Sequence, residues 1–413
     1  MKMMMGTRNN IVTAIDVGSA FVRVMAGELN AQTGFSLRAL VKTRSDGLRN
    51  GHIINLESLT PSIAEALREA ENIMGTRIRR AIVGISGVAL STHTDTTTVA
   101  VSRADSVISD LDVNRAVEES STRMAERRNV KVIHTIPSEY KIDGKKILGK
   151  PDGHTGNRLE VRTLFITASN PYLEGLASAI ESAGVEVRDI YASMIAESIV
   201  TTTPLERNAG CIIADIGAQT VSLVTYEDSI PTSLKILPIG SNNITNDIAL
   251  GMRIPLLEAE RIKIKELEDR KIAKRINEIV EARVSDILEL IDTHLKRLGR
   301  SELLPAGIIF TGAGAYTPNL ADMASKHLSL PARIAKNNLP EKMKVASTFT
   351  DSANTKVQTK QRERMDQARQ PEWSGVFGLC ALGLYAGPEE SMGIRVARET
   401  KTGILTFLRQ FLP

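Results

Sequence analysis

The chain has 413 residues, of which 42% are hydrophobic and 24% charged, with 52 Lys and Arg against 48 Asp and Glu. These values are typical of soluble globular proteins and, at this length, indicate two or three compact units. Basic and acidic residues are interspersed and only 4% of residues are aromatic. This excludes a dedicated nucleic-acid binder, which needs a clustered basic face and stacking aromatic rings.

The expected compartment is the reducing cytoplasm. The two cysteines, Cys211 and Cys380, both lie in apolar runs, so they predict buried thiols and provide neither a disulfide framework nor metal-ligand spacing. Residues 1–10 lack the apolar core of a signal peptide. No run approaches the roughly 18 apolar residues that a membrane span needs.

A predicted strand at residues 11–15 ends at Asp16, and a tight turn leads into a second strand at 21–29. Nearly half a chain later the pattern returns, with Asp215 closing a strand that begins at Cys211. The repeated Asp-x-Gly hairpin predicts two lobes built on one plan. The alternative is a pair of ordinary hairpins with Asp in the turn.

Between these hairpins, the pattern predicts a helix at 56–74 and a strand at 81–86. Residues 88–165 begin rich in Thr and Ser and then predict one helix near 112–128, followed by strands at 131–136 and 158–167, which is typical of an inserted small α+β domain. A further strand-helix pattern at 166–181 returns the chain to the first lobe.

Beyond the second hairpin, residues 243–299 are charge-rich and helical, and 307–311 form a short apolar strand. The polar stretch 341–370 is expected to be a flexible insertion or an exposed helix. A helical core pattern follows at 373–384, and then a polar linker at 389–400.

Binding a nucleoside triphosphate with Mg²⁺ requires backbone N–H groups around the phosphates and carboxylates for the metal. The two turns offer both, and Asp16 and Asp215 are predicted to face each other across a cleft as the metal-binding pair. The candidate residues for binding the nucleotide with its metal are Asp16, Gly18, Ser19 and Ala20 in the first turn, and Asp215, Gly217, Ala218, Gln219 and Thr220 in the second.

A third turn follows the strand at 307–311 and contains Gly312, Ala313 and Gly314. Its small residues would let an adenine ring or a ribose lie against the backbone. A Gly-rich turn between a strand and a helix is also common without any ligand, so the prediction depends on its place after the two phosphate turns.

The sequence resembles the actin, DnaK-type chaperone and sugar kinase superfamily, and more closely the FtsA family of bacterial cell division proteins. The stretches that carry the resemblance are 14–19, 132–140, 214–220, 247–249, 259–263 and 307–314. The His-x-Ile-Pro-x-Glu-Tyr segment at 134–140 lies in an inserted domain that distinguishes FtsA and its relative PilM from the rest of the superfamily. The resemblance implies a two-lobed actin-like α/β ATPase fold with an inserted SHS2-like α+β domain, binding ATP and Mg²⁺.

The same resemblance implies a division of the chain into lobes and smaller parts. The expected parts are a first lobe at 10–87 and 166–207, an inserted domain at 88–165, a second lobe at 208–242 and 307–388, a helical subdomain at 243–306, a linker at 389–400 and a tail at 401–413. Glu260 and Lys263 in the helical subdomain would contact the ribose and adenine side, although a solvated helix face is the alternative.

Two departures from the superfamily pattern predict weak binding and slow hydrolysis. Ala218 and Gln219 stand where the family usually has glycines, so they add side chains where the phosphates approach most closely. Ala192 stands where actins carry a Gln and chaperones a Glu to position the attacking water. Ser193 follows, and Glu197, more than one helical turn further on, is the nearest substitute.

The last residues predict an amphipathic helix at 401–413. One apolar stripe is formed by Ile404, Leu405, Phe407, Leu408, Phe411 and Leu412. This helix is too short to span a bilayer but long enough to lie in the membrane interface. The alternative is a terminal helix docked on its own domain, whereas the FtsA resemblance implies membrane targeting.

By resemblance, the protein is expected to be an ATP-dependent scaffold that self-associates into filaments at the cytoplasmic face of the cell membrane, at the division site. The helical subdomain would bind the C-terminal peptide of FtsZ, the inserted domain would contribute to filament contacts or bind later division proteins, and the tail would bind lipid. The alternatives are a PilM-like scaffold of type IV pilus assembly and a sugar or acetate kinase. The lack of a catalytic carboxylate at Ala192 argues against a kinase.

Overall fold

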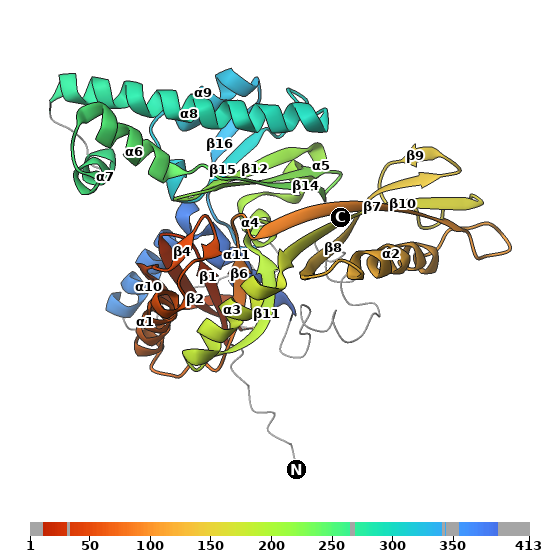
Figure 1. The fold of residues 1–413 in the computed structure, drawn as a ribbon. Coiled ribbons are helices and arrows are strands. Elements are labelled where there is room, and N and C mark those ends of the chain that lie inside the picture. The colour runs from red at the N-terminus through yellow and green to blue at the C-terminus, as the bar shows by residue number, and fades with distance from the viewer. Residues whose placement is uncertain (1–10, 31–33, 265–268, 341–342, 344–354, 387–413) are drawn as a thin grey trace, which may run out of the picture.

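The computed structural model describes residues 11–30, 34–264, 269–340, 343 and 355–386. Figure 1 shows two lobes, each built on a β-sheet, stacked one above the other, with a smaller α+β unit projecting to one side. The predicted tail residues Ile404 to Leu412 and the linker lie outside the described residues. Among the described helices, none is both long enough and apolar enough to cross a bilayer.

The first lobe is built on a five-stranded sheet with the strand order β11-β6-β1-β2-β3. The strands are β1 (Ile11–Val17), β2 (Phe21–Asn30), β3 (Gly34–Arg44), β6 (Arg80–Ile85) and β11 (Glu186–Ala192). Strand β1 is antiparallel to β2 and parallel to β6. A short ribbon of β4 (Leu48–Arg49) and β5 (His52–Ile53) follows β3.

Helices cover both faces of this sheet, because alternate residues of β1 point to opposite sides. Ile15 and Val17 pack in a cluster with α1 (Leu56–Met74) and α3 (Asn170–Ser182). Ala14 packs on the other side with α11 (Ser374–Ala386). Helix α4 (Ser193–Thr201) lies against α11 and leads towards the second lobe.

Helix α1 begins and ends where its residue types predict. The side chain of Asn55 accepts a hydrogen bond from the N–H of Ser58 at 3.1 Å, which satisfies a free donor of the first turn. Gly75 ends the helix in the left-handed conformation at φ 69°. Buried residues at Leu59, Ile63 and Leu67 recur at helical spacing, so the predicted helix at 56–74 is confirmed.

The second lobe repeats the plan of the first, with the strand order β14-β13-β12-β15-β16. The strands are β12 (Cys211–Ile216), β13 (Val221–Glu227), β14 (Ile230–Leu237), β15 (Ile308–Thr311) and β16 (Ala332–Ile334). In both sheets the first strand of the Asp-containing hairpin has an antiparallel neighbour on one side and a parallel one on the other. The predicted two-lobed α/β fold is confirmed.

Helices of the second lobe pack on one apolar cluster with its sheet. They are α6 (Ser241–Met252), α7 (Leu256–Ile264), α8 (Arg270–Leu298) and α9 (Leu320–Leu328), while α5 (Pro204–Ala209) precedes β12. Two short 3-10 turns, η1 (Ala313–Tyr316) and η3 (Pro371–Trp373), flank the region where the lobes meet. Helix α10 (Thr355–Ala368) leaves Arg362 and Glu363 exposed, as expected for an exposed helix in the polar stretch.

The projecting unit is a four-stranded sheet with the order β7-β10-β8-β9, covered by one helix. Its elements are β7 (Leu90–Ala100), α2 (Asp110–Ala125), β8 (Val130–Ile142), β9 (Lys145–Ile147) and β10 (Arg158–Ser169). Strand β8 is bonded to the first lobe by His134, whose Nε2 accepts a hydrogen bond from the N–H of Ala192 at 3.0 Å.

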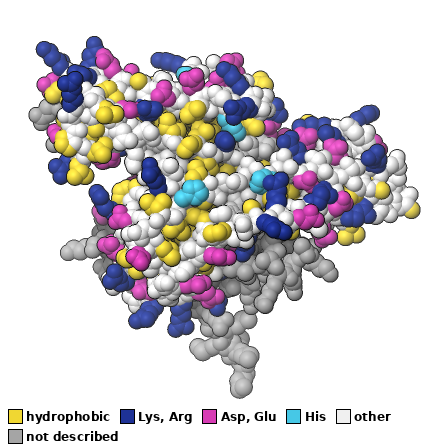
Figure 2. All heavy atoms as spheres, viewed as in Figure 1, with side chains coloured by type: hydrophobic (Ala, Val, Ile, Leu, Met, Phe, Trp, Pro, Cys, Tyr) yellow, Lys and Arg dark blue, Asp and Glu magenta, His cyan; other side chains and the backbone are white. Residues whose placement is uncertain are grey.

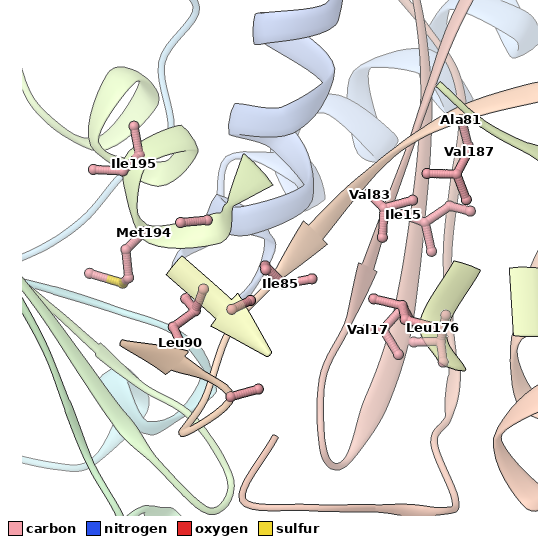
Figure 3. Close-up of a cluster of buried hydrophobic side chains, with 14 of the residues drawn as sticks. Ile15, Val17, Ala81, Val83, Ile85, Leu90, Leu176, Val187, Met194 and Ile195 are labelled. Atoms are coloured by element: carbon pink, nitrogen blue, oxygen red, sulfur yellow. The ribbon is translucent and has the colours of Figure 1, made fainter. Parts of the chain in front are cut away.

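The core of the first lobe continues to the point where this unit joins it. Figure 3 shows Ile15, Val83 and Leu176 among the sheet and helix side chains, and Leu90 and Met194 on the adjoining part of the same buried cluster. The cluster thus includes residues from β1, β7 and α4. Elements that hold the two Asp-containing turns are therefore set in one continuous apolar core.

Candidate functional site

The two Asp-containing turns have the same local geometry. In the first turn the N–H of Gly18 donates to the carbonyl of Phe21 at 3.1 Å, and in the second the N–H of Gly217 donates to that of Thr220 at 2.9 Å. Asp16 lies one residue before the end of β1, and Asp215 has the corresponding place in β12. The structure therefore presents two equivalent carboxylates beside two equivalent turns.

These two carboxylates are both buried, and both are affected by the charge of Arg23. Burial raises the pKa of Asp16, while the charge of Arg23 and the hydrogen bond from Ser193 Oγ at 2.9 Å lower it in part. Burial, followed by the charge of Asp16, raises the pKa of Asp215 to about 7, against the lowering effect of Arg23. A buried carboxyl whose pKa is raised by a neighbouring carboxylate, as that of Asp215 is by Asp16, favours a bound cation.

The first turn and the second turn both contain free backbone donors. Among the described residues, the N–H groups of Ser19, Ala20, Ala218 and Gln219 donate no hydrogen bond to another protein group. Unpaired N–H groups in successive residues of a turn form a concave site for an anion. The donors thus fit a bound phosphate chain.

The carbonyls of the second turn are satisfied by the start of α6. The N–H groups of Ser241 and Asn242 donate to the carbonyls of Gly217 and Ala218 at 2.9 and 2.8 Å. A Cβ at Gly240 would lie 2.7 Å from Ala218, so only glycine lets the helix approach this closely. The carbonyl groups of the second turn are therefore held against α6, whereas its N–H groups of Ala218 and Gln219 stay available to a ligand.

The third predicted turn lies directly against Asp215. Gly312 has φ 76°, and a Cβ there would lie 2.1 Å from Asp215 Oδ1, so both its conformation and its contact require glycine. Ala313 and Gly314 begin η1. The N–H of Gly312 donates to the carbonyl of Pro371 at 3.0 Å, which joins this turn to η3.

Glu260 and Lys263 lie on α7 and reach the second turn only through α6. Lys263 Nζ donates to Thr245 Oγ1 at 2.8 Å and forms an ion pair with Glu260 Oε2 at 2.7 Å. Lys263 also lies 3.4 Å from the carbonyl of Ser241, the first residue of α6. The structure thus brings both residues towards the second turn, and their contact with a nucleotide stays a prediction.

The sequence pattern did not determine where Glu197 lies relative to the two Asp-containing turns. The residue is 3% exposed, and its carboxyl accepts a hydrogen bond from Thr311 Oγ1 at 2.8 Å, so it joins α4 to the end of β15. Burial, followed by the charge of Asp215, raises its pKa well above the usual range. Ala192, by contrast, offers no polar side chain, and its N–H is taken by His134.

Sequence reasoning did not find Arg23, which acts electrostatically on Asp16, Asp215 and Glu197 alike. The available signal was its register, because Arg23 is the cross-strand partner of Asp16 in the first hairpin. The contact of Gln219 with the first lobe was not foreseen either: its Oε1 accepts a hydrogen bond from the N–H of Asn50 at 2.6 Å.

Two family models match this chain. One is described as "Cell division protein FtsA" and matches residues 212–374, and the other as "SHS2 domain inserted in FTSA" and matches residues 87–167. The FtsA of Bacillus subtilis is 28% identical over 352 residues, which span 80% of this chain and 79% of that protein. The FtsA of Neisseria meningitidis is 24% identical, and the match spans 99% of this chain and 99% of that protein.

Solved structures with the same fold include a PilM-PilN type IV pilus biogenesis complex, with a TM-score of 0.65 and 17% identity over 91% of this chain and 99% of that one. The ethanolamine utilization protein EutJ of Carboxydothermus hydrogenoformans has a TM-score of 0.51 and 13% identity over 90% of this chain and 89% of its own. At these identities the likeness shows the fold.

Proposed function

Because the chain belongs to the FtsA family of cell division proteins, we propose that it is an ATP-binding, actin-like scaffold that tethers FtsZ to the cytoplasmic membrane. The observation that carries the nucleotide part is the pair of equivalent turns, each with free N–H donors beside an acidic side chain. Self-association into filaments and recruitment of later division proteins belong to the same proposal.

The residues present fit Mg²⁺-ATP. Backbone N–H groups of Ser19 and Gln219 would bind phosphate oxygens, and Asp16 and Asp215 would hold the water shell of the metal. The described residues contain no group of three or more His, Cys, Asp or Glu arranged as a metal site. That agrees with Mg²⁺, which is usually bound through one or two carboxylates together with substrate phosphates. Bound Mg²⁺ would neutralise the charge of the phosphates.

We expect slow hydrolysis, because Ala192 has no side chain that orients water and the buried Glu197 is bound to Thr311. Calorimetric titration with Mg²⁺-ATP tests the binding, and a steady-state assay of phosphate release tests the turnover. Asp215→Ala should abolish binding by removing a carboxylate of the metal shell. Turnover of tens per second would contradict the scaffold proposal and favour an enzyme.

For the partner site, we propose the helical region 243–306. Figure 2 shows hydrophobic side chains over α6 and α7, and the exposed ones there are Leu250, Leu256, Leu257 and Ile264. Basic residues of α8, Lys271, Lys274 and Arg275, begin the next helix. Such a surface suits an amphipathic or acidic peptide such as the C-terminal peptide of FtsZ. Amide shifts on peptide titration should perturb this region, and no change at millimolar peptide would contradict the proposal.

The predicted tail helix supports attachment to the membrane. Burying one of its large apolar side chains is worth roughly 1.5 to 3 kcal/mol, so six such side chains leave a net gain of several kcal/mol after ordering costs. One tail is a weak anchor. Filament formation would link many tails and so convert weak contacts into stable attachment.

The PilM-like alternative rests on similarity of fold at 17% identity, whereas both family models and the relatives compared by sequence are FtsA. The kinase alternative would need an acceptor site and a catalytic base in addition to the nucleotide. Ala192 supplies no such base, and neither alternative requires an apolar tail.

A further inference from the structure

A cavity of about 480 Å³ lies where the projecting unit meets the two lobes. Strand β8 of the projecting unit lines it with Ile136 and Tyr140, and helices α4 and α5 line it from below the second sheet. The hairpin between β13 and β14 forms the side that belongs to the second lobe. The volume is within the usual range for a small-molecule site, about 300 to 1,000 Å³. None of the described lining residues belongs to an Asp-containing turn, so this cavity is separate from the nucleotide site.

The walls of the cavity are mainly apolar. Helix α4, strand β8 and the β13–β14 hairpin contribute aliphatic side chains and prolines, namely Ile136, Pro137, Ile195, Ile199, Ile230 and Pro231. Leu148 also lines the cavity and is 77% exposed, so it marks an opening to solvent. Water is held poorly by apolar walls, which offer it few hydrogen-bond partners. The walls therefore favour an apolar occupant.

A small polar group within the lining is centred on Arg207, which is 5% exposed. The carbonyl of Arg207 accepts a hydrogen bond from the N–H of Ser229 at 3.0 Å, and its Nη1 donates to the carbonyl of Ser198 at 3.3 Å. The hydroxyls of Ser198 and Tyr226 are hydrogen-bonded at 2.6 Å. Ser229 is 2% exposed, and its buried hydroxyl bonds to no described group. These four residues thus lie together in a mainly apolar lining.

The guanidinium of Arg207 has donors to spare. Its Nη1 also donates to the carbonyl of Thr202 at 3.2 Å and to Thr202 Oγ1 at 2.8 Å, which stabilises the end of α4. Its Nε and Nη2 donate to no described group, and no described carboxylate forms an ion pair with it, since the neighbouring Glu206 is paired with Arg333. A purely structural role accounts for Nη1 alone. A buried guanidinium with free donors is costly unless an anion satisfies them.

The other charged residues of the lining are exposed and of both signs. They are Asp110, Lys150, Asp152 and Asp228. Salt screens the interactions of exposed charges, whereas it screens those of a buried charge much less. Arg207 therefore determines which charge the interior of the cavity accepts.

We propose that this cavity binds a small amphipathic acid, which is an apolar molecule with one ionised carboxyl group. The carboxylate would accept hydrogen bonds from Arg207 and from the hydroxyl of Ser229, and the apolar part would lie against Ile195 and Ile199. A planar guanidinium binds both oxygens of a carboxylate at once. The esterified chain of a membrane lipid lacks this charge, so the site selects a free acid. Because the lining comes from three parts of the fold, the bound acid would hold the projecting unit against the second lobe.

The test measures the affinities of the full chain for decanoate and for its uncharged analogue 1-decanol by calorimetry, at decanoate concentrations too low for micelles. The variants are Arg207→Gln and the matched control Arg128→Gln, which removes an exposed arginine outside the lining. We expect Arg207→Gln to weaken decanoate binding by about tenfold or more, as for a lost charge-assisted hydrogen bond, and to leave the affinity for 1-decanol within about twofold.

A second pair of variants tests where the probes bind. Ile199→Phe adds bulk to the wall of the cavity, and Leu205→Phe places the same ring at an exposed position outside the lining. Ile199→Phe should lose affinity for both probes, whereas Leu205→Phe should bind them as wild type does. The tail is the same in every variant, so any binding of the probes to it cancels in the comparison.

Equal decanoate affinities of Arg207→Gln and Arg128→Gln would overturn the proposal, as would a wild-type chain that binds neither probe or binds both equally. If Ile199→Phe binds the probes as well as Leu205→Phe does, they bind elsewhere and the proposal is wrong. If Arg207→Gln melts near the assay temperature, Ser229→Ala decides: a loss for decanoate but not for 1-decanol supports the proposal, and no loss contradicts it. None of these outcomes changes the proposed nucleotide site.

Discussion

The side-chain oxygen of Gln219 and the backbone N–H of Asn50 form a 2.6 Å hydrogen bond that ties the second lobe to the first. The neighbouring N–H of Gly51 donates to Ser19 Oγ at 3.2 Å, so both Asp-containing turns contact the same segment. The carbonyl of Asn50 in turn accepts from the N–H of Val88, where the chain enters the projecting unit. One short segment thus contacts both turns and the start of that unit.

Removal of this bond should strengthen nucleotide binding. Gln219→Ala deletes the side-chain amide, so ATP no longer has to displace a contact between the lobes. A net hydrogen bond contributes about 0.5 to 1.5 kcal/mol, which corresponds to a roughly two- to tenfold gain in ATP affinity. Gln219→Gly also removes the side chain that crowds the phosphates and should bind at least as tightly. Fluorescence titration with a labelled ATP measures both. Weaker binding by the alanine variant would identify the side chain of Gln219 as a further ligand of the nucleotide.

Asp215→Asn should have opposite effects on stability and on binding. The pKa of Asp215 is raised to about 7, so between pH 4 and 7 the folded state holds more protons than the unfolded state and loses stability as the pH rises. The amide does not titrate, so the variant without nucleotide should be more stable than wild type, by up to a few kcal/mol, at pH 8 and less so at pH 5. Thermal denaturation measures this. Mg²⁺-ATP should no longer raise the melting temperature; if it still does, Asp215 does not bind the metal.

Glu197→Gln and Glu197→Ala should differ in stability. The glutamine keeps an acceptor for the buried hydroxyl of Thr311, so we expect a change within about 1 kcal/mol. Alanine leaves that hydroxyl unsatisfied and opens a cavity, which should cost about 1 to 3 kcal/mol or more in urea denaturation. If the glutamine variant instead loses all residual phosphate release while it still binds ATP, Glu197 is the group that activates water.

His134 should make the anchoring of the projecting unit sensitive to acid. Burial lowers its pKa from 6.5 to about 4, so between these values the unfolded state binds more protons and stability falls as the pH falls. The full loss is about 3 kcal/mol, and a protonated ring also loses the hydrogen bond from Ala192. His134→Gln keeps an acceptor and should show a shallower loss between pH 6.5 and 4. His294, with a similarly lowered pKa, is present in both proteins, so the difference isolates His134. Parallel pH profiles would contradict this assignment.

The sequence predicted the backbone of the site better than its side-chain partners. The two hairpins and α1 followed from apolar strands, Asp-x-Gly turns and a helical pattern, all of which are local signals. Strand β7 was missed as a strand because its Thr-rich sequence carries few large apolar residues, and pairing with β10 determines its conformation.

The contacts that assemble the site join residues far apart in the chain. Thr311 meets Glu197, and Gln219 meets Asn50, only because the lobes pack together, and no local pattern encodes either pair. Arg23 was overlooked since a charged residue in a strand usually points to solvent. Its register opposite Asp16 was the one clue, and it becomes informative only when the hairpin is known.

Co-sedimentation of the full chain with anionic liposomes, with and without Mg²⁺-ATP, tests the proposed membrane scaffold most directly. Wild type should pellet with liposomes, and more completely with Mg²⁺-ATP, whereas Phe407→Glu, which places a charge in the apolar stripe of the tail, should stay in the supernatant and still bind ATP. A wild-type chain that ignores liposomes in both states, together with a Phe407→Glu variant that unfolds or loses ATP binding, would show a docked terminal helix and contradict the account.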